Sequence, residues 1–320
     1  MRKILITGAN GQLGSELTIE LRKLAGSENV IATDISEPDK NQREGLFEKL
    51  DVLDKELYEE LIRKYKITEI YHLAALLSAN AEKNIETAWR LNMDGLLNTL
   101  NLACKFGVDK VFWPSSIAVF GPDALKNNTP QESPCNPTTV YGITKVAGEQ
   151  WCAYYHRKFG LDVRSIRYPG LIGYKSLPGG GTTDYAVDIY HKAVIDEPFN
   201  CFLNRDSALP MMYMNDAVKA TIDLMNAPSE RLSVRTSYNV SAISFTPEEI
   251  ANSIKKHIPG FSIRYEPDYR QEIADSWPDS IDDSVARRDW NWEPDFNLDK
   301  MTMDIIRHLP KIIEKTSSMQ

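Results

Sequence analysis

The sequence is poor in cysteine and has no long apolar run. Its 320 residues include four cysteines, scattered without paired spacing at positions 104, 135, 152 and 201. Such cysteines suit free thiols in a reducing compartment better than a disulfide framework or a metal site. No apolar run reaches the roughly 20 residues needed to cross a bilayer, and Ile4-Leu5-Ile6 is too short for the core of a signal peptide. We therefore expect a cytoplasmic protein without a membrane partner.

Acidic residues outnumber basic ones, 45 to 37. The formal net charge is -8 and the pI is about 5.3, and no basic patch suggests binding to nucleic acid. The five histidines, at positions 72, 156, 191, 257 and 308, show no ligand spacing, so we predict no metal site. The remaining composition, 42% hydrophobic and 26% charged, is that of a globular protein with room for one large domain or two smaller ones.

Strand-like apolar runs alternate with helical patterns in the first half of the chain. The predicted strands are residues 4–7, 30–33, 69–73, 110–114 and 162–167, and the predicted helices are residues 12–24, 58–65, 87–106 and 139–159. Repeated strand–helix–strand units whose strands are apolar throughout indicate an α/β fold. We predict a Rossmann-type, doubly wound parallel sheet with helices on both faces.

This rhythm ends at Arg167. We assign residues 1–167 to a nucleotide-binding domain and residues 168–320 to a smaller α/β lobe that binds substrate. The two are expected to interleave, because a return segment at about 211–240 again has strand and helix patterns. The elements predicted after Arg167 are strands at 210–214 and 238–240 and helices at 217–225, 247–257 and 298–309.

A glycine-rich turn follows the first predicted strand and opens the first helix. The glycines of Gly8-Ala-Asn-Gly11-Gln12-Leu13-Gly14 allow a tight turn and a close approach to a pyrophosphate at the helix N-terminus. Asp34 follows the second strand, where a carboxylate can bind the adenosine ribose, and no arginine comes directly after it, which favours NAD over NADP. Taken singly, the glycines are compatible with a plain turn and Asp34 with a solvated turn residue. Further expected cofactor contacts are Asp51 and Val52 at the adenine, and Leu73, Ala74 and Ala75 at a strand end with small side chains.

A tyrosine and a lysine at helical spacing supply the candidate chemistry. Tyr141 and Lys145 are four residues apart, so on a helix they share one face. A free tyrosine has a pKa of about 10, and a fixed ammonium group beside it lowers that pKa toward the range of a general base. Ser115 and Ser116 end a predicted strand, where open sheets bind ligands, although a turn cap is the commoner role of such a pair. Asn92 lies on the intervening predicted helix.

Together these residues resemble the extended short-chain dehydrogenase/reductase superfamily. Within it, the sequence is most similar to the short-chain-type L-threonine 3-dehydrogenases, and the similarity spans nearly the whole chain. The segment Gly-Gly-Gly-Thr-Thr-Asp-Tyr-Ala at residues 179–186 is specific to those enzymes. The other matching segments are residues 76–79, 168–172, 275–278 and 284–292.

The resemblance implies NAD-dependent oxidation of L-threonine to 2-amino-3-oxobutanoate. It assigns Tyr141 as the base, Lys145 to the nicotinamide ribose and to lowering the pKa of Tyr141, and Ser116 to the substrate hydroxyl. The backbone of residues 169–171 would meet the nicotinamide, with Pro169 and Leu171 as cofactor contacts beside Asn92. Ser78, Ser115, Gly181, Thr182, Thr183 and Trp277 would surround the substrate. For Trp277 a core role, and for the two threonines a loop-stabilising role, are the alternatives.

The resemblance also implies a homodimer formed by the helices at 87–106 and 139–159, and a downstream partner, a coenzyme A-dependent ligase. The main alternative is a UDP-sugar 4-epimerase, for which Arg235, Arg264 and Arg270 could hold a diphosphate. Pro114 and Phe120 depart from the epimerase pattern and weaken that reading. A non-catalytic nucleotide sensor is disfavoured because Tyr141 and Lys145 are both present.

Overall fold

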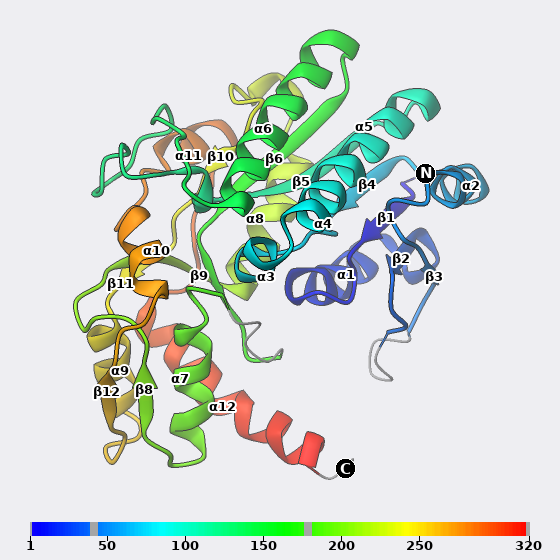
Figure 1. Ribbon diagram of the computed structural model, residues 1–320. Helices are drawn as coiled ribbons and strands as arrows, with labels where there is room; N and C mark the ends of the chain where they lie inside the picture. Colours follow the sequence, from blue (N-terminus) through cyan, green and yellow to red (C-terminus); the bar gives the residue numbers. More distant parts are fainter. Residues whose placement is uncertain (1, 39–43, 176–180, 318–320) are drawn as a thin grey trace.

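The computed structural model describes residues 2–38, 44–175 and 181–317. Its centre is a seven-stranded parallel sheet with the strand order β10-β6-β5-β4-β1-β2-β3 (Figure 1). The predicted Rossmann-type fold is confirmed. The strands are β1 (Ile4–Thr7), β2 (Val30–Asp34), β3 (Phe47–Lys49), β4 (Glu69–His72), β5 (Lys110–Ser116), β6 (Asp162–Tyr168) and β10 (Tyr238–Asn239).

Helices cover both faces of this sheet, which explains why its strands are apolar throughout. Along β1, Ile4 and Ile6 pack into one core and Leu5 into another. The first core also takes in α1 (Gln12–Ala25), α8 (Met214–Asn226) and α11 (Ser284–Trp290). The second takes in α2 (Lys55–Tyr65), α5 (Gly95–Phe106) and α6 (Val140–Phe159).

The elements that follow β6, apart from α8, β10 and α11, form a second lobe with a core of its own. Strands β7, β9 and β11 make a small sheet, and β8 pairs with β12. Helix α8 and strand β10 then bring the chain back to the large sheet, where β10 pairs with β6. The bounds are β7 (Gly170–Ile172), α7 (Tyr185–Val194), β8 (Phe199–Cys201), β9 (Leu209–Tyr213), β11 (Ile243–Phe245), α9 (Pro247–Lys255), β12 (Ile263–Tyr265), α10 (Arg270–Ser276) and α12 (Leu298–Ser317).

The order of the large sheet reverses at β1, which lies between β2 and β4. In doubly wound sheets, ligands bind in the crevice at the carboxyl ends of the strands on either side of this point. The segments at that edge here are the glycine turn after β1, residues 73–77 after β4, the two serines that end β5, and Pro169 after β6. The fold therefore gathers the predicted site residues at one edge.

Several predicted elements differ from the structure. The helices predicted at 217–225 and 298–309 are longer, as α8 and α12, and the helix predicted at 247–257 is shorter, as α9. The helix predicted at 87–106 is a run of α4 (Ile85–Trp89), a π-helical turn (Arg90–Asp94) and α5. The helix predicted at 58–65 begins three residues earlier, because the Asp54 side chain caps it by accepting a hydrogen bond from the Leu57 N–H. The strand predicted at 210–214 exists as β9, but it belongs to the small sheet.

Candidate active site

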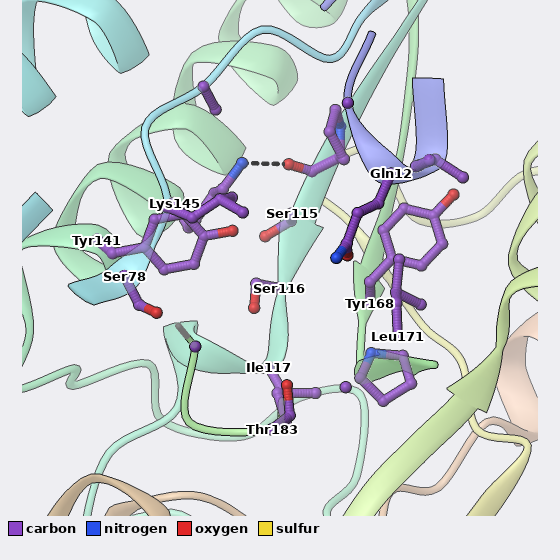
Figure 2. A pocket seen from close by; sticks show the side chains of 18 of the residues that line it. Gln12, Ser78, Ser115, Ser116, Ile117, Tyr141, Lys145, Tyr168, Leu171 and Thr183 are labelled. Atoms are coloured by element: carbon purple, nitrogen blue, oxygen red, sulfur yellow. Dashed lines mark hydrogen bonds between the residues drawn. The ribbon is translucent and has the colours of Figure 1, made fainter. Parts of the chain in front are cut away.

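A cavity of about 290 Å³ lies at the carboxyl edge of the large sheet, between the two lobes (Figure 2). The described residues that line it come from the strand ends of the large sheet, from α1, α6 and the short helix α3 (Ser78–Lys83), and from the second lobe. They are Gly8, Gly11, Gln12, Leu13, Gly14, Leu73, Ala75, Leu77, Ser78, Asn80, Pro114, Ser115, Ser116, Ile117, Tyr141, Lys145, Tyr168, Pro169, Gly170, Leu171, Gly181, Thr182, Thr183, Asp184 and Trp277.

The glycine turn has the shape that a dinucleotide pyrophosphate requires. Gly8 has a φ of 70°, and a Cβ atom on it would lie 2.7 Å from the backbone nitrogen of Ala74. A Cβ atom on Gly14 would lie 2.2 Å from the carbonyl oxygen of Gly8. Gly11 is the N-cap of the 14-residue helix α1 and has no side chain to cap its first N–H groups. Those donors and the positive end of the helix dipole fit an anionic group at the turn.

Asp34 ends β2 next to this turn. Its Oδ2 accepts a hydrogen bond from the backbone N–H of Asn10 at 3.0 Å, and its Oδ1 accepts one from Ser36 N–H at 3.1 Å. The carboxylate is thus fixed beside the glycine turn, at the edge where a ribose would lie, although it is not among the residues that line the cavity.

Four other predicted cofactor residues also lie outside the cavity lining. Asp51 is exposed, and its Oδ1 accepts from the N–H of Leu53 at 2.9 Å. The side chain of Val52 is buried in the core against α5, so only its backbone can reach a ligand. Ala74 packs its backbone against Gly8.

Asn92 is the fourth, and it acts on two elements that do line the cavity. It lies in the π-helical turn, and its Oδ1 accepts from Leu76 N–H at 2.8 Å. Its Nδ2 donates to Leu76 O at 3.1 Å and to Thr144 Oγ1 at 3.2 Å. Asn92 therefore ties the loop after β4 to the helix that carries Tyr141, and π-turns often occur at functional sites.

Tyr141 and Lys145 lie on one face of α6, as their spacing predicts. Thr139 caps this helix by accepting from the N–H of Gly142 at 3.1 Å. The Tyr141 hydroxyl points toward Ser115 and Ser116 (Figure 2). Lys145 Nζ lies 5.3 Å from the centroid of the Tyr141 ring and donates a 2.6 Å hydrogen bond to Pro114 O.

The expected lowering of the Tyr141 pKa by Lys145 is not found. Burial raises the pKa of Tyr141 to about 12, and a hydrogen bond with Ser116 acts in the opposite direction. Burial also lowers the pKa of Lys145 to about 7, against the opposing effects of Cys152 and Glu149. The physical reason is that the dry site penalises both charged forms, while the ammonium is directed at the Pro114 carbonyl rather than at the phenol.

The two serines occupy different environments. Ser116 caps a 3-10 turn (Ile117–Val119) by accepting from the N–H of Ala118 at 3.2 Å, and its side chain lies at the cavity. The Ser115 hydroxyl donates to Glu149 Oε1 at 2.6 Å. Glu149 in turn forms a buried ion pair with Arg167 at 2.8 Å. The Ser115 hydroxyl therefore donates its proton to Glu149 rather than to a group in the cavity.

The second lobe contributes the start of α7 and the end of α10. Gly181, Thr182 and Thr183 line the cavity directly before α7, and Trp277, buried and directly after α10, lines it as well. The rest of the predicted glycine loop, residues 178–180, lies outside the described residues.

Sequence reasoning missed several lining residues, of which Asp184 has the most distinct chemistry. Its Oδ2 accepts from the N–H of Gly181 at 2.8 Å. An acid directly after Thr-Thr at a helix start was the available signal. The other lining residues to which the sequence analysis gave no role as contacts are Leu77, Asn80, Pro114, Ile117 and Tyr168.

Within the described part of the chain, no group of three or more His, Cys, Asp or Glu side chains could hold a metal ion. None of the helices in the described ranges is long and apolar enough to span a membrane.

A parallel sheet with a glycine turn at its reversal point and a Tyr-x-x-x-Lys pair at the same edge defines a protein of the short-chain dehydrogenase/reductase class. The model of the NAD dependent epimerase/dehydratase family matches residues 4–241. The chain belongs to this family.

Relatives and solved structures extend the similarity beyond the matched region. An uncharacterized epimerase/dehydratase of Staphylococcus saprophyticus is 50% identical over 305 residues, which cover 94% of this chain and 95% of the relative. The holo form of the GalE-like L-threonine dehydrogenase from Cupriavidus necator is 55% identical with a TM-score of 0.94, over 96% of this chain and 99% of that one. A monomeric L-threonine 3-dehydrogenase from a metagenome is 50% identical with a TM-score of 0.93, over 97% and 99% of the two chains.

Proposed function

We propose that this protein oxidises L-threonine at its β-hydroxyl to 2-amino-3-oxobutanoate, with NAD as the hydride acceptor. The observation that carries the proposal is the set of groups facing the second-lobe side of the cavity: the hydroxyls of Thr182 and Thr183, the carboxylate of Asp184 and the indole of Trp277. The high identity to L-threonine dehydrogenases of known structure supports the same substrate.

The charges of the cavity suit a small amino acid. Lys145 is the only lysine or arginine, and Asp184 the only acid, among the described residues that line it. The substrate ammonium would face Asp184, and the carboxylate would face neutral hydroxyls such as those of Ser78 and Thr182. Charge-assisted hydrogen bonds of this kind are about twice as strong as neutral ones.

The same charges disfavour a UDP-sugar 4-epimerase, whose diphosphate would call for cations. Arg235 is paired with Asp162 at 2.9 Å, and Arg270 with Asp268 at 2.6 Å. Arg264 is exposed on β12. None of these arginines lines the cavity, and residues 176–180, Ser-Leu-Pro-Gly-Gly, contain no basic side chain.

The chain's own residues would position the substrate and move its proton. Ser116 would hold the β-hydroxyl, and Tyr141 would accept the hydroxyl proton. Because burial raises the pKa of Tyr141, the phenol needs a nearby positive charge to act as a base, and Lys145 is the cation within reach. When bound, the nicotinamide would accept hydride from the β-carbon. We propose that residues 1–167, with the return segment 211–240, hold the cofactor and the rest of 168–320 holds the substrate.

The proposed product gives the protein a place among other enzymes. We propose that 2-amino-3-oxobutanoate is cleaved by a coenzyme A-dependent ligase to give glycine, or that it loses carbon dioxide on its own. We place the oxidation and these later reactions in the cytoplasm. This part of the proposal rests on the family resemblance.

We also propose a homodimer. Apolar side chains are exposed on α4 and α6, which pack against each other. They are Ile85, Trp89, Ile143, Trp151, Tyr154 and Phe159. Leu96 of α5 and Tyr155 of α6 are buried within the chain and do not contribute to this exposed face. Since a relative with 50% identity is described as monomeric, the exposed side chains, rather than the similarity, carry this part of the proposal.

The reaction is tested by mixing the purified protein with NAD and either L-threonine or UDP-galactose and following NADH absorbance. The proposal predicts steady NADH formation with threonine alone, because an epimerase returns the hydride to its sugar and accumulates no NADH. If the protein converts UDP-galactose and forms no NADH from NAD with threonine, the proposal is overturned.

A further inference from the structure

Lys145 is a buried lysine, and the carboxylate that acts on its charge, that of Glu149, is already engaged. The residue is 2% exposed, so its ammonium has lost most of its hydration. Glu149, one helical turn away, accepts two hydrogen bonds from Arg167, at 2.9 and 2.8 Å, and one from Ser115. Its charge is therefore shared with another cation, and the charge on Lys145 requires further support.

The indole of Trp113 lies directly beneath this ammonium. Lys145 Nζ is 4.5 Å from the centroid of the Trp113 ring, within the range of about 6 Å for an attractive cation–π contact. Tryptophan is the strongest aromatic partner for a cation, and the attraction is larger where water is excluded. Trp113 also directly precedes Pro114, whose carbonyl oxygen accepts the hydrogen bond from Lys145. Two consecutive residues of β5 thus hold one ammonium group.

Gly148 makes room for this indole. Trp113 is 3% exposed and lies against α6, where a Cβ atom on Gly148 would be 2.3 Å from Cη2 and 2.5 Å from Cζ2 of the ring. A glycine inside a helix is unfavourable in itself, so its presence here marks a close approach. Gly148 follows Lys145 by three residues, so the space that it leaves for the indole and the Lys145 side chain lie on the same face of the helix.

We propose that Trp113 is a positioning residue: its ring keeps the Lys145 ammonium charged and directed at the active site, and Gly148 is the slot that admits the ring. The importance of this for catalysis rests on the proposed function, in which Lys145 assists Tyr141. The contact itself does not depend on the identity of the substrate.

Other titratable or charged groups face Lys145 from three elements. They are Tyr141, Glu149 and Cys152 on α6, His72 on β4, and Arg167 on β6. Burial raises the pKa of the Cys152 thiol and lowers that of His72 to about 3, so both are neutral near pH 7. Burial raises the pKa of Tyr141 to about 12, which keeps the phenol neutral there too. A protonation change in this cluster near pH 7 therefore belongs to Lys145, whose own pKa burial lowers to about 7.

The test measures the protonation of Lys145 in the full chain without threonine or NAD. Trace labelling with acetic anhydride at a series of pH values, followed by mass spectrometry of the Lys145 peptide, gives the apparent pKa, because only the neutral amine reacts. Trp113→Leu removes the aromatic face, and Trp113→Phe keeps a weaker one. We expect the pKa of Lys145 to fall by about one unit in Trp113→Leu and by less than about half of that in Trp113→Phe.

Gly148→Ala is the second variant, because its methyl group displaces the ring without changing it. The pKa of Lys145 should fall in this variant too. An unchanged pKa in Trp113→Leu, or equal shifts in the Leu and Phe variants, would overturn the proposal. If circular dichroism shows that Trp113→Leu does not fold, a wild-type pKa in Gly148→Ala would overturn it instead. If threonine is not the substrate, the NADH assay fails while these labelling results are unaffected.

Discussion

Lys145 and Tyr141 carry the main electrostatic conflict of the active site. Both are titratable groups in a dry environment, and burial favours the neutral form of each. The reaction proposed here needs the opposite pair, an ammonium and a phenolate. Each charge stabilises the other when both are present, so the two groups are expected to titrate as a coupled pair during catalysis.

The lowered pKa of Lys145 predicts a pH dependence of stability. The unfolded chain holds the lysine proton up to the ordinary pKa of 10.5, whereas the folded chain releases it near pH 7. The unfolded state then binds more protons between these values, so the free energy of unfolding should rise with pH in this window. Above about pH 10 the raised pKa values of the buried tyrosines act in the other direction.

Lys145→Met keeps the length of the side chain and removes its charge. From pH 7 to 9, we expect urea denaturation to show wild-type stability rising relative to this variant by on the order of 2 kcal/mol. If the free energy of unfolding changes with pH in the same way in both proteins, Lys145 keeps its ordinary pKa in the folded state.

At the residue scale, the sequence predicts chemistry better than it predicts hydrogen-bond partners. Tyr141, Lys145, Ser116 and Thr182 were expected in the site from spacing and resemblance, and the structure brings them to one cavity. The acceptor for Lys145 could not be foreseen. It is the backbone carbonyl of Pro114, and its position depends on how β5 and α6 pack rather than on any side-chain type.

The turn from β1 to α1 is the element on which cofactor binding depends. Its close backbone contacts leave no space for a side chain at Gly14, where a Cβ atom would be 2.2 Å from Gly8 O. We expect Gly14→Ala to weaken NAD binding by at least about tenfold, since the turn must open and its N–H groups move from the pyrophosphate. Isothermal titration calorimetry with NAD measures this.

Gly260→Ala is the matched control, because a Cβ atom there meets nothing within 4 Å and the glycine has no positive φ. Its NAD affinity should equal that of the wild type. Tight binding by Gly14→Ala would show that the dinucleotide does not lie on this turn.

At the element scale, most elements of the first half were predictable and several of the second lobe were not. The patterns at 139–159 and 162–167 predict α6 and β6 to within two residues. The second-lobe elements β8 and α10 have three and seven residues, too few for a periodicity to emerge. The π-helical turn at Arg90–Asp94 was also hidden, because its residues have the same pattern as an α-helix and the turn is fixed by the contacts of Asn92.

At the scale of the whole molecule, two lobes meet at one cavity, and an apolar helical face remains exposed. If α4 and α6 form a dimer interface, the protein should sediment as a dimer at micromolar concentration. Replacing Trp151 with Glu would place a charge in an apolar contact and should shift it toward a monomer.

Tyr269→Glu, at an exposed aromatic residue near α10, is a control that should leave the dimer intact. If the wild-type protein sediments as a monomer, the proposed homodimer is wrong. The threonine reaction is a separate proposal, which the NADH assay tests directly.

The overall architecture was the most predictable property of the chain. Apolar strands followed by helices lead to a parallel sheet with two covered faces, and its order reverses at β1 beside the glycine turn. The small sheet of β7, β9 and β11 could not be foreseen, because pairing between distant short strands leaves no local pattern.

The most direct test of the account is the turnover of threonine by Tyr141→Phe. Loss of the proton-accepting oxygen should lower kcat by about 10² to 10⁴-fold, the usual contribution of a general base. Tyr154→Phe, at an exposed tyrosine of the same helix, should keep wild-type turnover. Near-normal NADH formation by Tyr141→Phe would contradict the role of this phenol and the mechanism built on it.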